Sequence, residues 1–142
     1  MNLIRVLLTT AIVCAASASG SSAETSWRPL RVPGFWEKPY GGILDKHDGF
    51  AWYRCFVKIP AEWRGQKVDL TLGRIDDCDE SFVNGAKVGA MGTRKPYATA
   101  SGKLRVYAVD PNIIRFGAWN LITVRVFDGG GGGGIWQGPL RL

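Results

Sequence analysis

The sequence predicts an all-β domain, an antiparallel sandwich or barrel, from three observations. Apolar and polar side chains alternate with a period of two over residues 52–59, the pattern of a strand with one buried face. Asn84-Gly85 stands between two short strand-like runs and predicts a tight hairpin, because both turn residues must take positive φ. Turn signals recur at strand-like spacing, and no segment shows a convincing helical period.

The individual strands follow from the same patterns. Residues 52–59 end at Pro60, which has no N–H to donate to a neighbouring strand. Residues 121–127 are rich in β-branched side chains, which favour strands. Residues 111–116 have room for one helical turn. The strands expected in chain order are residues 52–59, 68–72, 80–83, 86–88 and 121–127.

The first 23 residues have the features of a secretory signal peptide. Arg5 supplies a basic start, residues 6–16 are apolar, and small residues precede Glu24. We expect residues 1–23 to be a signal peptide, residues 24–142 to form one domain, and the protein to be secreted or periplasmic. An uncleaved anchor is the alternative, although a membrane span needs about 20 apolar residues and this run is shorter.

The charge of the chain indicates solubility more than nucleic-acid binding. Its formal net charge is +6, and removing Arg5 with the predicted signal peptide leaves +5. The Lys and Arg residues are scattered, without a basic cluster, and a spread of this kind is typical of a solvated face. We expect no nucleic-acid partner, no membrane contact after cleavage, and at most some attraction to acidic glycans.

Two cysteines remain after signal cleavage, Cys55 and Cys78. Export would place them where a disulfide can persist, and it forms only if their Cβ atoms come within about 4.5 Å. The sequence leaves open whether Cys55 and Cys78 form a disulfide or remain two separate thiols.

Residues 129–134 are six consecutive glycines directly after the strongest predicted strand. Such a run loses much conformational entropy when it is ordered. We expect a flexible surface loop, and a backbone pressed against a ligand or a neighbouring module is the alternative.

Four segments in order carry a resemblance to a known family. They are residues 27–38 (WRPLRVPGFWEK), 48–63 (DGFAWYRCFVKIPAEW), 68–89 (VDLTLGRIDDCDESFVNGAKVG) and 117–142 (GAWNLITVRVFDGGGGGGIWQGPLRL). Together they resemble the sugar-binding jelly-roll domain of glycoside hydrolase family 2, above all the version carried by sialate O-acetylesterase-type proteins. The resemblance implies a galactose-binding-like jelly-roll sandwich. It covers nearly the whole predicted mature chain.

The chain offers no convincing catalytic set of its own. Its one histidine, His47, lies in a predicted loop, and no serine stands in a GxSxG or GDS-type block. In family 2 enzymes the acid and the nucleophile come from a separate barrel domain. The acidic run that includes Asp76 and Asp77 is expected to shape a turn through Asx-type hydrogen bonds, with a structural calcium site as the alternative. We expect no other cofactor.

Sugar binding needs an aromatic face and a few polar side chains. Trp36 and Trp136 stand in Pro- or Gly-rich segments and are the tryptophans expected to be exposed, as a paired platform. Through the resemblance, Asn84 and Asp128 match residues that reach the substrate pocket in some family 2 β-galactosidases. Asn84 also suits the hairpin turn itself. We expect these four residues to gather at one loop end.

These observations predict a non-catalytic carbohydrate-binding or accessory module of a carbohydrate-active hydrolase system. Its partner would be a carbohydrate or a neighbouring hydrolase domain. One alternative is a truncated piece of a sialate O-acetylesterase or β-galactosidase-like enzyme whose catalytic domain lies elsewhere. Another is a structural docking module with no sugar ligand, which a broad apolar patch on one sheet face would favour.

Overall fold

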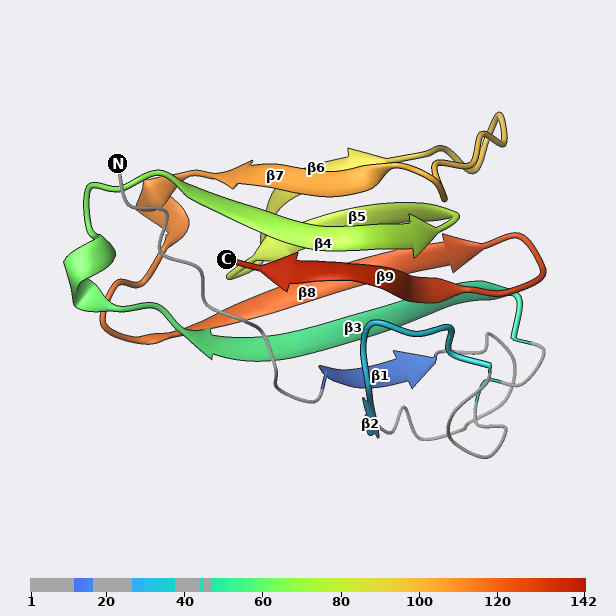
Figure 1. The fold of residues 1–142 in the computed structure, drawn as a ribbon, viewed down its shortest axis with the longest axis horizontal. Helices are drawn as coiled ribbons and strands as arrows, with labels where there is room; N and C mark the ends of the chain where they lie inside the picture. Colours follow the sequence, from blue (N-terminus) through green and yellow to red (C-terminus); the bar gives the residue numbers. More distant parts are fainter. Residues whose placement is uncertain (1–11, 17–26, 38–43, 45–46) are drawn as a thin grey trace.

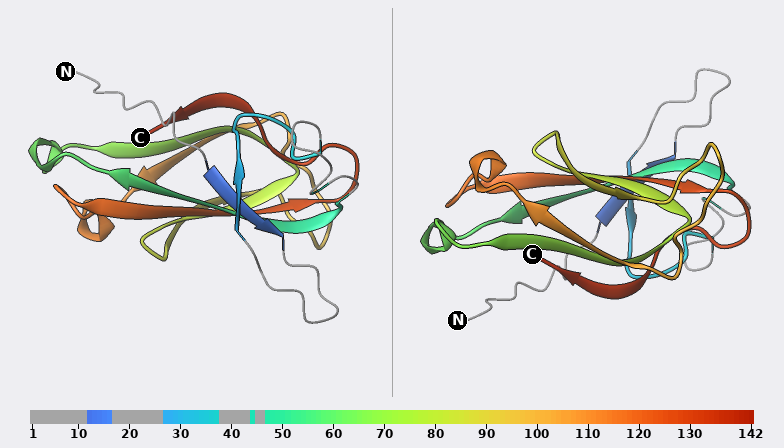
Figure 2. Two further views of the ribbon diagram at one scale, coloured as in Figure 1. Left: turned by 90° about the horizontal axis from the view of Figure 1, so that it is seen from below. Right: turned by 90° about the horizontal axis from the view of Figure 1, so that it is seen from above.

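The computed structural model describes residues 12–16, 27–37, 44 and 47–142, and its strands form two antiparallel sheets packed face to face (Figures 1 and 2). One sheet has the order β2-β1-β3-β8-β5-β6 and the other the order β7-β4-β9. The elements are β1 (Ile12–Ala16), β2 (Arg28–Leu30), β3 (Gly49–Lys58), η1 (Ala61–Trp63), β4 (Val68–Asp76), β5 (Cys78–Val83), β6 (Ala86–Met91), β7 (Leu104–Val109), η2 (Pro111–Ile113), β8 (Trp119–Asp128) and β9 (Gly134–Arg141). This confirms the predicted antiparallel jelly-roll sandwich.

Strands β3 and β8 form the centre of the larger sheet. They pair over ten residues each, from Gly49 opposite Asp128 to Lys58 opposite Trp119. Alternate side chains, such as that of Tyr53, point into the core between the sheets, and those between them point outward. The period of two over residues 52–59 and the β-branched content of residues 121–127 thus predicted these two strands correctly.

The Asn84-Gly85 hairpin is also confirmed. Both residues have positive φ, 50° and 85°, and they join β5 to β6. The turn lies near the end of the sandwich that carries η1 and η2, opposite the end where β8 passes into β9 (Figure 1).

The N-terminal part of the chain adds to the edge of the larger sheet. Strand β1 pairs with β2 on one side and with β3 on the other. Strand β1 thus takes residues 12–16 of the predicted signal peptide into the sheet, and residues 1–11 and 17–23 lie outside the described residues. Cleavage of the predicted signal peptide and export of the protein stay predictions. In the described part of the chain, no helix has the length and apolar character to cross a membrane.

The apolar core between the sheets also contains a cluster of buried polar side chains. Arg105 on β7 and Asp79 on β5 are both fully buried, with Nε and Oδ1 2.9 Å apart. The Asp79 carboxylate also accepts hydrogen bonds from Tyr107 and Ser81. Asp79, the third acidic residue of the DDCDE run, thus pairs with an arginine in the opposite sheet.

Candidate functional site

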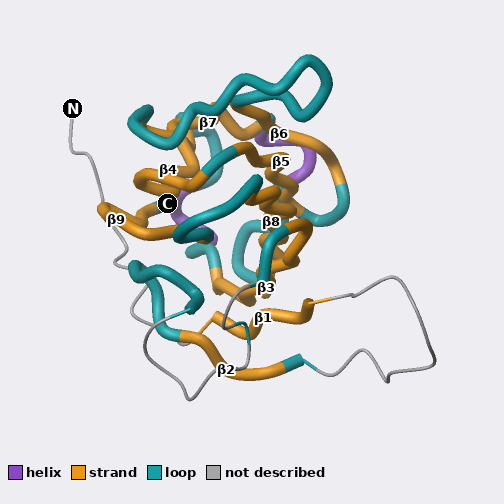
Figure 3. The backbone as a smooth tube through the Cα atoms, turned by 90° about the vertical axis from the view of Figure 1, so that its right-hand side faces the viewer, coloured by secondary structure: helices purple, strands orange, loops and turns teal. Residues whose placement is uncertain are grey.

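The loops at the β8–β9 end of the sandwich face the viewer in Figure 3, and we call this end the glycine-loop end. Here the glycine run, residues 129–134, packs against residues 34–37. Trp36 N–H donates to the Gly133 carbonyl over 3.0 Å, and Gly34 N–H donates to the Ile135 carbonyl over 2.8 Å. The Glu37 carboxylate accepts from the Gly133 N–H over 2.8 Å.

The expectation of a flexible surface loop is wrong for the second half of this run. The first three glycines are exposed, but Gly133 and Gly134 are buried. A Cβ atom on Gly133 would stand 2.3 Å from the nearest ring carbon of Trp36. Glycine is required at this position because the Trp36 indole occupies the space of a side chain.

Trp36 is not the exposed residue that the sequence predicted. Only 3% of its surface is exposed, because its ring lies between the glycine loop and the Tyr53 and His47 rings, 6.4 Å and 5.7 Å away. Trp136 is half-buried and stacks on Phe35 with a centroid distance of 5.6 Å. The predicted Trp36–Trp136 platform is therefore replaced by a Phe35–Trp136 stack.

Asp128 ends β8 at the glycine-loop end and is fully buried. Its Oδ1 accepts a hydrogen bond from the Gly130 N–H over 2.9 Å. Burial raises the pKa of Asp128 despite this bond. Among the described residues, its Oδ2 finds no hydrogen-bond partner, and neither do the nearby Trp36 Nε1 and Glu37 Oε2. Three buried polar atoms of this end thus have no hydrogen-bond partner among the described residues.

Two further carboxylates complete the acidic character of this end. Asp77 accepts hydrogen bonds from Tyr97 Oη (2.5 Å) and from Gly129 N–H (2.9 Å), and so ties two loops together instead of forming the Asx turn expected from the sequence. Burial acts against ionisation of Asp77, but hydrogen bonds from Thr99, Tyr97 and Gly129 hold its pKa below its usual value.

Asp76, next to it, behaves in the opposite way. Burial, the hydrogen bond to Asp77 and the negative charges of Asp77 and Asp128 raise the pKa of Asp76 to about 7. Near neutral pH this position therefore carries a proton that an exposed aspartate would have released.

Asn84 does not belong to this end, which corrects the prediction of a four-residue cluster. Its side chain donates to the Ile113 carbonyl and to Asn120 Oδ1, both over 2.7 Å, and accepts from the Leu121 N–H over 3.0 Å. Asn120 and Leu121 lie at the start of β8, whereas Asp128 lies at its end, about 25 Å further along the strand. Asn84 is fully engaged in holding the hairpin to the sheet.

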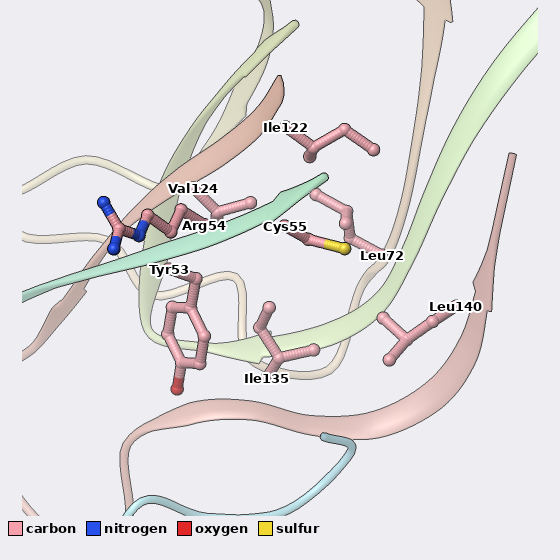
Figure 4. Close-up of a pocket in the computed structure, with 8 residues that line it drawn as sticks. All are labelled: Tyr53, Arg54, Cys55, Leu72, Ile122, Val124, Ile135 and Leu140. Carbon is pink, nitrogen blue, oxygen red and sulfur yellow. The ribbon is translucent and has the colours of Figure 1, made fainter. Parts of the chain in front are cut away.

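The described residues contain no group of three or more His, Cys, Asp or Glu side chains that could hold a metal ion. Within the same residues, His47 Nε2 lies 3.1 Å from the Phe50 carbonyl and its ring packs on Trp36. A small cavity of about 10 Å³ lies between the sheets and is lined by apolar surface of residues such as Cys55 and Leu72 (Figure 4). It is too small for a sugar.

Cys55 and Cys78 are both buried free thiols, so the disulfide left open by the sequence is not formed. Cys55 pairs in register with Ile122 of β8, and Cys78 pairs with Phe127 of the same strand. Five residues of strand separate those two positions by about 17 Å, far beyond disulfide reach.

The sequence analysis missed a second surface, the outward face of β3 and β8. The side chains of Phe56 and Trp119 on this face are 56% and 61% exposed. Arginines lie over other rings: Arg54 over Trp27 at 4.0 Å and Arg125 over Phe50 at 4.9 Å. The sequence could have revealed this surface. In both strands the residues that alternate with the apolar inward positions must point outward, and they include Phe56 and Trp119.

The fold has well-matched counterparts among solved structures. A β-D-glucuronidase from Dictyoglomus thermophilum has a TM-score of 0.71 at 17% identity, over 88% of this chain and 20% of that one. A β-glucuronidase from Ruminococcus gnavus, in complex with an N1-substituted uronic isofagomine, has a TM-score of 0.73 at 16% identity, over 88% and 22%. A glycosyl hydrolase family 2 member from Bacteroides cellulosilyticus has a TM-score of 0.71 at 24% identity, over 95% and 20%.

At these identities the likeness shows a shared fold, that of a β-sandwich domain found in family 2 glycoside hydrolases. The chain spans about a fifth of the length of the structures that it matches. No family model matches the sequence, and no curated protein matches it. The motif-based resemblance thus agrees with the structural neighbours on glycoside hydrolase family 2, while the link to sialate O-acetylesterase-type proteins rests on the motifs alone.

Proposed function

We propose that this chain is an exported, non-catalytic accessory module of a glycoside hydrolase system, and that it binds carbohydrate. One observation carries the proposal: nearly all of the chain has the fold of a β-sandwich that makes up about a fifth of family 2 glycoside hydrolase structures. A module of this kind has its place beside a catalytic domain, as the motif resemblance to sialate O-acetylesterase-type proteins also suggests.

The glycine-loop end supports a sugar site of limited size. Asp128 Oδ2 and Glu37 Oε2 are acceptors without a described partner, and Trp36 Nε1 is a donor without one, which suits a hydroxyl group. The Phe35–Trp136 stack supplies the apolar ring surface beside them. Trp36 then acts as a wall of the site and not as its exposed platform.

Chemical-shift mapping of the purified chain with a galactoside, a glucuronide and a sialoside tests this proposal. We expect shifts at Gly130, Gly133 and Trp136, with an affinity near ~1 mM because one stacked ring contributes only about 0.5–1.5 kcal/mol beyond area burial. Trp136→Ala should weaken binding. Lys67→Gln serves as the control, since Lys67 is exposed just before β4, at the other end of the sandwich, and its substitution should leave sugar affinity unchanged. Absence of shifts with all three sugars would refute carbohydrate binding at this end.

A further inference from the structure

The outward face of β3 and β8 carries a compact group of side chains that the proposed sugar site does not use. We call the group formed by Arg54, Phe56, Lys58 and Trp119 the outer patch. In the sheet register, Lys58 is directly opposite Trp119, and Phe56 is opposite Leu121 two residues along. Trp119 and Phe56 are the most exposed large apolar side chains among the described residues, and Tyr97 follows at 55%.

This composition is unusual for a sheet face in water. A sheet packed on one side normally presents polar residues on the other. Two large rings exposed side by side lose the free energy that burial would give them, and such patches mark binding surfaces. No outward residue of β3 or β8 is acidic: the outward positions are Phe50, Trp52, Arg54, Phe56 and Lys58 on β3, and Trp119, Leu121, Thr123, Arg125 and Phe127 on β8.

The patch also carries positive charge that is not neutralised. Within the described part of the chain, Arg54 and Lys58 form no ion pair, whereas Arg125 and Lys87 on the same face both pair with Glu80. Arg54, Phe56 and Lys58 are alternate residues of one strand, so the Cα atom of Phe56 lies about 6.7 Å from that of each basic residue. The row is cation, ring, cation, with the Trp119 ring beside it.

A linear acidic sugar chain matches this row. The apolar C–H face of a sugar ring packs on an aromatic side chain, and carboxylates form charge-assisted hydrogen bonds with guanidinium and ammonium groups. A protein partner fits less well, because the centres of protein interfaces are depleted in lysine, and Lys58 stands beside both exposed rings. We propose that the outer patch binds acidic polysaccharides, with Phe56 and Trp119 contacting sugar rings and Arg54 and Lys58 contacting carboxylates. This inference rests on the proposed carbohydrate-binding function and assigns it a second site.

The experiment titrates the full chain with short oligogalacturonides and with their methyl esters, which keep the rings and remove the charge. We expect shifts at residues 54–58 and 119–121, binding by the acid that weakens as salt is raised, and much weaker binding by the ester. Equal binding of acid and ester, or shifts elsewhere only, would overturn the proposal.

Variants separate the ring contribution from the charge. Trp119→Ala should weaken oligogalacturonide binding about three- to tenfold, and Lys58→Gln should weaken it to a smaller degree and reduce the salt dependence. Lys67→Gln is the matched control. Lys67 is an exposed lysine just before β4, outside the outer patch, and its substitution should leave oligogalacturonide affinity unchanged. All three positions lie on the surface, so the variants should fold, which a circular dichroism spectrum checks. No loss of affinity in Trp119→Ala would overturn the role of the ring.

Two further outcomes distinguish this inference from the proposed function. Poly-glutamate that binds as tightly as the oligogalacturonide would show that the patch recognises charge, as in docking of an acidic protein, and would overturn the glycan assignment alone. A second outcome is that neutral galactosides bind at the glycine-loop end while no acidic ligand causes shifts at the outer patch. That result would overturn this inference and leave the proposed function standing. Failure of every saccharide at both places would remove both proposals.

Discussion

Arg105 and Asp79 form a fully buried ion pair that joins the two sheets of the sandwich, with Nε and Oδ1 2.9 Å apart. The arginine also donates to the carbonyls of Ala100, Lys103 and Asp77, so its remaining N–H groups are engaged as well. The cluster fixes the position of β7 over β5. It also fixes the loop that separates β6 from β7.

Removal of one partner of this pair should strongly destabilise the fold. Arg105→Met leaves the Asp79 carboxylate buried without its cation, and we expect a loss of about 3–5 kcal/mol in the free energy of unfolding. Urea denaturation measures it. The double variant Arg105→Met/Asp79→Leu should recover part of the loss, because no uncompensated charge remains. A single variant as stable as the parent chain would contradict the structural role of the pair.

The tight packing of the glycine loop on Trp36 predicts a marked effect of one methyl group. Gly133→Ala would place its Cβ 2.3 Å from the Trp36 ring and should destabilise the fold by about 1–3 kcal/mol. Gly102→Ala is the control, because a Cβ there meets no atom within 4 Å. The thermal unfolding midpoints of both variants test this prediction. Equal midpoints would show that the glycine loop accommodates the methyl group without loss of stability.

The hairpin residue Asn84 should act through its turn and its hydrogen bonds together. Asn84→Ala puts alanine at positive φ, leaves the Leu121 N–H without its side-chain acceptor and removes one of the hydrogen bonds of Asn120, so we expect a loss of about 2 kcal/mol or more. Asn84→Gly removes only the hydrogen bonds and should lose less. Urea midpoints of the two variants give the difference, and identical values would mean that the backbone conformation adds nothing.

Asp76 should make the stability of the protein fall as the pH rises from about 4 to about 7. Its pKa is raised from 3.8 to about 7 in the folded state, so the folded protein holds a proton that the unfolded chain releases over this range. The stabilising contribution is complete below pH 4 and is lost as pH approaches 7. Asp77, whose pKa is lowered, contributes with the opposite sign.

The variant Asp76→Asn isolates this effect. It should be more stable than the parent chain at pH 8 and equally stable near pH 4, as measured by urea denaturation across the range. A difference in stability that does not change with pH would contradict the raised pKa of Asp76.

The absence of a catalytic set leads to a negative prediction. The purified chain should show no turnover of a chromogenic acetyl ester or galactoside above buffer, because no nucleophile–base pair is evident in its sequence. A turnover assay with His47→Ala as the paired variant is the check. Activity that disappears in this variant would prove the interpretation of His47 wrong.

Local patterns predicted the strands and the hairpin because their causes are local. Alternation along β3 and β8 and the demand of Asn84-Gly85 for positive φ depend on neighbouring residues only. The position of Trp36 could not be inferred this way. Its Pro- and Gly-rich surroundings suggest exposure, but it is buried by glycines that follow nearly a hundred residues later.

The candidate site was predicted only in part for a related reason. Asp128 was placed correctly at a strand end, and the structure adds its burial and its free oxygen. Asn84 was assigned to the same end because both residues lie in turns, yet an antiparallel strand carries its two ends to opposite sides of the sandwich. Only the register of β8 with β5 reveals which turn lies where.

The contact between residues 34–37 and the glycine loop also sets an order of events during synthesis. Glu37 and Gly133 lie 96 positions apart, so the first of them leaves the ribosome long before its partner exists. Residues 34–37 cannot form their hydrogen bonds to Gly133 and Ile135 until these residues have been synthesised and β9 has paired with β4. Residues 34–37 are thus synthesised early and dock last. Their protection from proteases would report that the whole sandwich has folded.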